Sequence, residues 1–197
     1  MASMGFIDIS TYRARISVTL YQHQGSQVPE ISRSDVPGLD PSVWSPIPKL
    51  ADFRGKFEDR NPLNIPGPFY GAETTKCWIG PNEAPNNVML DWGGQEFVFR
   101  QPTTIGELQQ VIKAAICDPF SGYGADGDDH WNVRLIREWW EGMENRLAQI
   151  GQLASMNDNT DQWASFSNSQ AERYLRKYAF FVENQRLPKL ADHLPDL

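Results

Sequence analysis

Prolines are concentrated in one part of this 197-residue chain, and they constrain its structure more than any other feature does. Ten of the 14 prolines fall between Pro29 and Pro85. Each proline fixes φ and removes a backbone donor, so a regular helix or a central strand is disfavoured there. The span nevertheless contains many large apolar side chains: Trp44, Leu50, Phe53, Phe57, Ile65, Phe69, Tyr70 and Trp78. The sequence therefore predicts an ordered coil over residues 29–86 that wraps on the core and buries its aromatic rings.

Two parts of the chain have the alternating pattern of strands. Residues 15–20 alternate polar and apolar side chains, which predicts a strand with one buried face. Residues 87–91 and 95–100 predict a hairpin around Trp92-Gly93-Gly94, because glycine adopts the positive φ that tight turns require. In this hairpin Val88 and Leu90 share one face and Phe97 and Phe99 share another, and we expect one apolar side to meet the core.

Capping patterns mark the starts of two predicted helices. Thr104 and Glu107 form a capping box, and apolar side chains at helical spacing follow as far as about Cys117. Ser169 and Glu172 form a second capping box, which begins a helix that ends or kinks near Pro188.

Between them lies the segment with the clearest amphipathic pattern. Its apolar residues are spaced three and four apart, which predicts one long helix. Asp128 or Asp129 is its predicted N-cap, since a carboxylate accepts the orphan amides of a helix start. The apolar residues are Val133, Ile136, Trp140, Met143, Leu147 and Ile150.

The order of these elements predicts an α+β fold. The N-terminal strand and the 87–100 hairpin would form an antiparallel sheet, packed against about three C-terminal helices. The length and the 40% hydrophobic content suit a single domain over residues 1–197.

Charge and composition narrow the classes of function. The formal net charge of -7 disfavours binding to a nucleic-acid backbone and favours a basic protein partner. The sequence contains no run of about 18 apolar residues, so it predicts no membrane span. Residues 1–10 lack the pattern of a secretory signal. We therefore expect a cytoplasmic protein with two reduced thiols, Cys77 as an incidental thiol and Cys117 in the core.

Residues 118–130 form an acidic, glycine-containing loop ahead of the long helix. Asp118, Asp126, Asp128 and Asp129 lie in it. Three interpretations remain open: a helix cap with a solvated loop, a metal site, or a negative patch for a basic protein surface. The order of residues differs from that of a calcium-binding loop, and we expect no cofactor.

The start of the helix after this loop has a second candidate feature. Trp131, Leu135 and Trp139 form an apolar stripe, with Arg134 beside it. Such a stripe is either buried inside the domain or offered to a partner, because tryptophan and arginine are common interface residues. His130 lies among the carboxylates, and an Asp–His pair is one possible acid–base arrangement.

Two segments carry a resemblance to known proteins. Residues 65–71 (Ile-Pro-Gly-Pro-Phe-Tyr-Gly) and 95–102 (Gln-Glu-Phe-Val-Phe-Arg-Gln-Pro) look like segments of small bacterial proteins without assigned activity. In its general make-up the chain resembles immunity proteins of bacterial polymorphic-toxin systems. That resemblance implies a compact, acidic protein of the cytosol that has no catalytic motif.

The leading hypothesis is a non-catalytic binding protein that neutralises a basic toxin or enzyme domain. Its predicted contact residues are Asp118, Asp126, Asp128, Asp129, Trp131, Arg134 and Trp139. One alternative is a metal-assisted hydrolase that uses the 118–130 loop, with Asp118, Asp126, Asp128 and His130. Another is a structural or assembly subunit that pairs through the Trp131–Trp139 stripe. The oligomeric state does not follow from the sequence.

Overall fold

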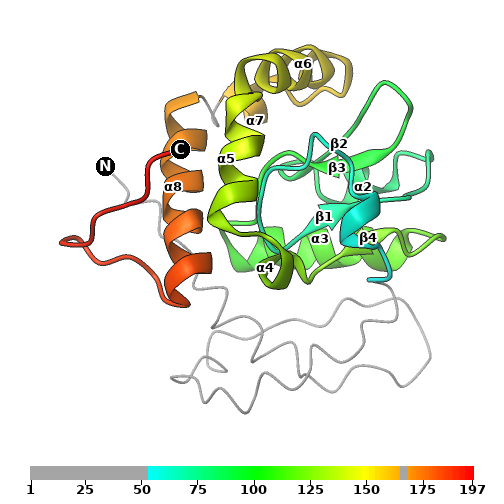
Figure 1. Cartoon of the computed structure of the whole chain (residues 1–197). Coiled ribbons are helices and arrows are strands. Elements are labelled where there is room, and N and C mark those ends of the chain that lie inside the picture. Colours follow the sequence, from blue (N-terminus) through cyan, green and yellow to red (C-terminus); the bar gives the residue numbers. More distant parts are fainter. Residues whose placement is uncertain (1–52, 165–167) are drawn as a thin grey trace.

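The computed structural model describes residues 53–164 and 168–197, and these residues form an α+β fold (Figure 1). The predicted strand over residues 15–20 and the part of the proline-rich span before Phe53 lie outside them. In the described part of the chain, two small antiparallel sheets are surrounded by seven α-helices. None of these helices has the length and apolar character needed to cross a membrane.

The described part of the proline-rich span is largely coil and supplies much of the core, as predicted. It contains the short 3-10 helix η3 (Phe57–Asp59) and the strand β1 (Tyr70–Gly71). Two predictions for this span are wrong. Trp78 is 46% exposed rather than buried. Residues Ile79–Glu83 form helix α2, which tolerates Pro81 because the first turn of a helix needs no amide donor there.

The predicted hairpin is present. Strands β2 (Val88–Leu90) and β3 (Glu96–Val98) pair antiparallel, with Val88 opposite Val98. Gly94 has a φ of 81°, as a glycine in a tight turn can. The hairpin is buried on both faces, whereas the sequence predicted one. Val88 and Val98 pack toward helix α3 (Ile105–Cys117), while the opposite face meets helix α6 (Met143–Met156).

Side chains complete both edges of this two-stranded sheet. Asn157 accepts a hydrogen bond from Leu90 N and donates one to Leu90 O, at 3.0 and 3.2 Å. On the other edge, Val98 N donates to Asn64 Oδ1 at 2.8 Å, and Glu96 N donates to Thr74 Oγ1 at 2.8 Å. These bonds satisfy strand edges that would otherwise be buried with unpaired amides.

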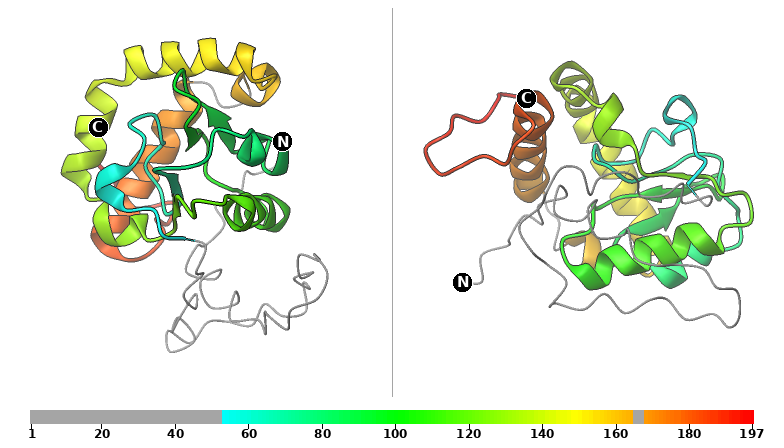
Figure 2. Two further views of the ribbon diagram at one scale, coloured as in Figure 1. Left: turned by 90° about the vertical axis from the view of Figure 1, so that its right-hand side faces the viewer. Right: turned by 90° about the horizontal axis from the view of Figure 1, so that it is seen from below.

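The second sheet joins segments that are far apart in the sequence. β1 pairs with β4 (Tyr123–Gly124), with Tyr70 opposite Gly124. A Cβ atom on Gly124 would lie 1.9 Å from the Tyr70 ring, so only glycine fits there. Figures 1 and 2 show both sheets between α3 and α6. The sequence did not predict β1 or β4, because two-residue strands have no recognisable period.

Helix α3 has the predicted bounds and the predicted cap. Thr104 Oγ1 accepts a hydrogen bond from Glu107 N at 3.1 Å. The Glu107 carboxylate accepts bonds from the backbone and hydroxyl of Thr103 and forms an ion pair with Arg100. Cys117, at the end of this helix, is exposed and not in the core as predicted.

Replacing Thr104 with alanine is expected to lower the free energy of unfolding by about 1 kcal/mol, because the Glu107 amide loses its acceptor. Urea denaturation measures the change. Ser155→Ala, at an exposed position within α6, is the control and should stay within about 0.5 kcal/mol of the parent. Equal stability of the two variants would contradict the capping role.

The predicted long helix is divided in two. Helix α5 (Val133–Glu141) ends at Gly142 and α6 begins at Met143. At the break, the Arg146 guanidinium donates to the Trp139 carbonyl and occupies the space that a side chain on Gly142 would need. The apolar pattern continues across the break because the halves pack on different clusters, Ile136 with α8 (Asn168–Asn184) and Ile150 with the hairpin.

The start of α5 and the C-terminal helices complete the fold. Asn132 Oδ1 accepts a hydrogen bond from Leu135 N at 3.0 Å, so Asn132 is the N-cap, not Asp128 or Asp129. A separate short helix, α4 (Gly127–His130), precedes it. After α6, helix α7 (Thr160–Ala164) leads toward α8. α8 ends at Asn184, before Pro188, and Gln185 then adopts a φ of 53°.

Candidate functional site

Two short helices, η3 and α4, carry a group of exposed carboxylates that we call the acidic surface. We use this name for the exposed carboxylates of Glu58 and Asp59 in η3 and of Asp126 and Asp129 at α4. Phe57 of η3 and His130 of α4 stack with their ring centroids 4.8 Å apart. This contact places segments that are about 70 residues apart in the sequence side by side.

Backbone packing holds α4 in a fixed position. Gly127 N donates to Pro68 O at 3.0 Å, and a Cβ atom on Gly127 would lie 2.1 Å from Gly67 O. Only glycine allows this close approach of α4 to the proline-rich segment. The short helix therefore presents its carboxylates from a rigid support.

Asp126 is the best-defined carboxylate of the acidic surface. The Tyr70 hydroxyl lies 2.6 Å from Asp126 Oδ1 and 2.9 Å from Gly55 O, and its single proton goes to the closer, charged acceptor. Burial, and then the hydrogen bond to Asp126, raise the pKa of Tyr70 well above its ordinary value. The other oxygen, Asp126 Oδ2, lies 3.1 Å from His130 Nε2.

The structure brings together the Asp–His pair that the sequence suggested. The pair is open to solvent, since 38% of the His130 side chain and 53% of the Asp126 side chain are exposed. In residues 53–164 and 168–197 no three His, Cys, Asp or Glu side chains are grouped so that they could hold a metal ion. The residues of the hydrolase alternative therefore do not assemble into a metal site.

Asp118 does not belong to the acidic surface, which corrects the prediction that it faces a partner. Only 2% of the residue is exposed. Its carboxylate accepts hydrogen bonds from Thr75 N at 2.9 Å and from Gly122 N at 2.7 Å. The negative charge is used internally, to fix the loop between α3 and β4. Asp128 is half-buried, and its Oδ1 accepts a hydrogen bond from the Tyr178 hydroxyl at 2.8 Å.

The tryptophan stripe of α5 is also internal, so Trp131 and Trp139 are not contact residues. Each is 5% exposed. Trp131 packs edge-on against Phe57, with ring centroids 5.1 Å apart, and Trp139 Nε1 donates to Pro62 O at 3.2 Å. The proline-rich segment thus covers the stripe that the assembly alternative would have used. Arg134 remains exposed and forms an ion pair with Glu138 of the same helix.

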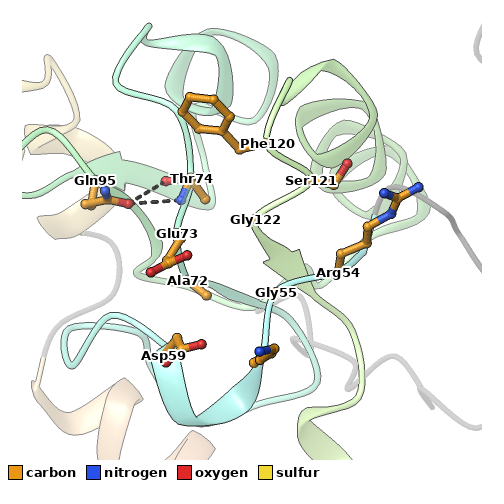
Figure 3. A pocket seen from close by; sticks show the side chains of 11 residues that line it. Arg54, Gly55, Asp59, Ala72, Glu73, Thr74, Gln95, Phe120, Ser121 and Gly122 are labelled. Atoms are coloured by element: carbon orange, nitrogen blue, oxygen red, sulfur yellow. Dashed lines mark hydrogen bonds between the residues drawn. The ribbon is translucent and has the colours of Figure 1, made fainter.

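A cavity that the sequence did not indicate lies beside η3. It has a volume of about 440 Å³ and lies between segments 54–59, 72–74 and 120–122 (Figure 3). Its charged lining residues are Arg54, Lys56, Asp59 and Glu73. Phe120 borders the cavity and is 69% exposed. The sequence signal for this site is Phe120 itself, an aromatic residue in a Pro-Phe-Ser-Gly turn outside any predicted helix or strand.

No protein-family model, no curated protein and no solved structure matches this chain.

Proposed function

We propose that this protein is a non-catalytic binding protein that neutralises a basic toxin or enzyme domain by covering it with the acidic surface. The observation that supports this proposal is the placement of four exposed carboxylates, from Glu58, Asp59, Asp126 and Asp129, on two short helices that stack on each other. The resemblance of the chain to bacterial immunity proteins points to the same class.

The rigidity of the surface favours tight and selective binding. Asp126 is held by Tyr70 and His130, and α4 is held by Gly127 on the proline-rich segment. Carboxylates that are already in place lose little conformational entropy when a partner binds. The net charge of -7 adds a long-range field that speeds encounter with a basic protein.

Neutralising the acidic surface tests the proposal. The variant combines Glu58→Gln, Asp59→Asn, Asp126→Asn and Asp129→Asn. At position 126 the asparagine carbonyl still accepts from Tyr70, so the fold is retained. With the basic partner isolated from the native cells, we expect roughly tenfold weaker binding at low salt and a flatter dependence of affinity on ionic strength. Calorimetric titration at several salt concentrations measures both.

A matched variant controls for the change in total charge. Glu141, Glu144, Asp158 and Asp161 are exposed on the α5–α7 part of the chain, and Figure 1 shows α6 and α7 at the opposite end of α5 from α4. Replacing these four with their amides removes the same number of charges. Only the variant of the acidic surface should weaken the complex. Equal effects from both sets would show that net charge, not this surface, governs binding.

A further inference from the structure

Phe120 is exposed on a loop whose backbone is fixed by several hydrogen bonds. The Asp118 carboxylate binds the amides of Thr75 and Gly122, and Ser121 N donates to Asp118 O at 3.0 Å. Ser121 has a φ of 52°, a strained value for a residue that is not glycine. Such strain persists only where surrounding contacts impose it, and it is common at binding sites. The backbone that carries the Phe120 ring is thus fixed at the border of the cavity before any ligand arrives.

Four charged side chains, two of each sign, line the cavity. Figure 3 shows Asp59 and Glu73 on the same side, with Ala72 between them, and Arg54 on the opposite side; Lys56 also lines the cavity. Both acidic side chains are exposed. Within the described residues no hydrogen bond or ion pair engages either carboxylate. One side of the cavity therefore combines two available negative charges, and Phe120 lies at its border.

We propose that this cavity receives an arginine or lysine side chain of the basic partner. The inference rests on the proposed function and names the contact that would give it specificity. The cationic head would meet the carboxylates of Asp59 and Glu73, and the face of Phe120 favours a cation by its quadrupole. The methylene stem fits against Ala72 and the backbone of Gly55 and Gly122, which present no side chains that compete for the space.

Small probes test this inference without the partner. N-acetyl-arginine amide and N-acetyl-lysine amide carry the cationic head, and N-acetyl-citrulline amide has a neutral head of nearly the same shape as arginine. In NMR titrations of the isotope-labelled full chain, the cationic probes should produce saturable shifts at the amides of residues 72–74 and 120–122. Citrulline should bind at least about tenfold more weakly. Equal binding of citrulline, or no saturable shift with either cation, overturns the proposal.

Variants test whether these side chains hold the probe; Asp59 belongs to both sites, whereas Glu73 and Phe120 belong to the cavity alone. Asp59→Asn combined with Glu73→Gln should abolish saturable binding of the arginine probe, and Phe120→Ala should weaken it several-fold. Leu190→Ala, at a fully exposed apolar residue of the C-terminal tail, is the control for Phe120 and should bind the probe as the parent does. Unfolding midpoints close to that of the parent confirm that each variant is folded. Unchanged probe binding in the Asp59–Glu73 variant overturns the proposal.

Failure of this inference is distinguishable from failure of the proposed function. Asp126→Asn with Asp129→Asn alters the acidic surface but leaves the cavity intact, so the arginine probe should bind this variant normally. If no probe binds while the partner still binds through the acidic surface, the cavity proposal is wrong and the proposed function stands. If the probes bind but the partner is insensitive to both sets of changes, the proposed function is wrong.

Discussion

Replacing Asn64 with alanine is expected to lower the free energy of unfolding by roughly 3 to 5 kcal/mol, since it leaves several buried backbone groups without partners. Asn64 is 1% exposed. Its Nδ2 donates to Asn61 O and to Gly71 O, both at 2.7 Å. Its Oδ1 accepts from Gly71 N at 2.9 Å and from Val98 N at 2.8 Å. One amide thus takes the place of a strand between β1 and β3, which are not paired in a sheet.

Thermal and urea denaturation measure this effect, which corresponds to a fall in Tm on the order of 10 °C. Asn145→Ala is the control, because Asn145 lies on the exposed side of α6 and should change stability by less than about 0.5 kcal/mol. Asn64→Asp keeps the acceptor, but its second oxygen would face the carbonyl oxygens of Asn61 and Gly71 and bury a charge, so it should be no more stable than Asn64→Ala. A loss below about 1 kcal/mol for Asn64→Ala would show that water replaces the amide.

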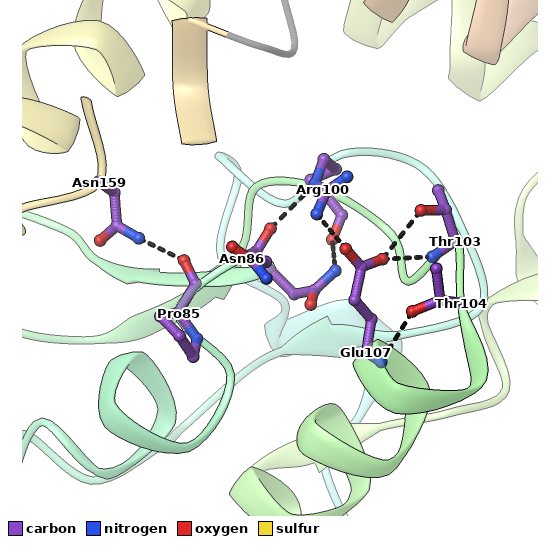
Figure 4. Close-up of polar contacts among 8 residues, drawn as sticks. Pro85, Asn86, Arg100, Thr103, Thr104, Glu107 and Asn159 are labelled. Atoms are coloured by element: carbon purple, nitrogen blue, oxygen red, sulfur yellow. Dashed lines mark hydrogen bonds and ion pairs between the residues drawn. The ribbon is translucent and has the colours of Figure 1, made fainter. Parts of the chain in front are cut away.

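Elements whose signals are local could be predicted from the sequence. The hairpin and α3 have the expected positions, and the cap of α3 depends on residues within a few positions of one another. Figure 4 shows Glu107 bonded to Thr103 and Arg100, all within eight consecutive residues. Such interactions depend on spacing along the chain, and spacing is visible in a sequence.

The candidate site was harder to predict because distant segments determine which charges are exposed. The acidic loop contained four similar aspartates, and nothing local distinguished Asp118 from Asp126. Asp118 is buried, and one of its partners is the amide of Thr75, 43 residues earlier in the chain. The Trp131–Trp139 stripe is covered for a similar reason, since Phe57 and Pro62 pack on it from the proline-rich segment. Neither contact has a sequence signature.

Replacing Glu96 is also expected to have a large effect on the free energy of unfolding. Glu96 is a charged residue next to Phe97 in the hairpin, yet it is fully buried in the structure. Its Oε1 accepts from Gly80 N at 2.8 Å, and its Oε2 accepts from the Tyr123 hydroxyl at 2.6 Å. Glu96→Ala leaves these two buried donors without an acceptor. Glu96→Gln can serve both groups, so the alanine variant should be less stable than the glutamine variant by roughly 2 to 4 kcal/mol.

The pH dependence of stability gives a second, independent test of Glu96. Burial raises the pKa of its carboxyl group above the ordinary value, the charge of Asp118 adds to this effect, and the bonds from Tyr123 and Gly80 oppose it. The native state therefore holds the proton more tightly than the unfolded chain does. The resulting stabilisation is complete below the unfolded pKa and is lost as the pH rises through the folded pKa.

Glu96→Gln has no proton to lose, so it should not show this decline. Denaturation of both proteins between about pH 4 and about pH 8 should show the glutamine variant gaining stability relative to the parent as the pH rises. Glu141→Gln, at an exposed carboxylate of α5, is the control for removing one acidic group from the surface. A constant difference between the parent and Glu96→Gln over this range would mean that the buried carboxyl group titrates as it does in the unfolded chain. Its hydrogen bonds would then fully offset its burial.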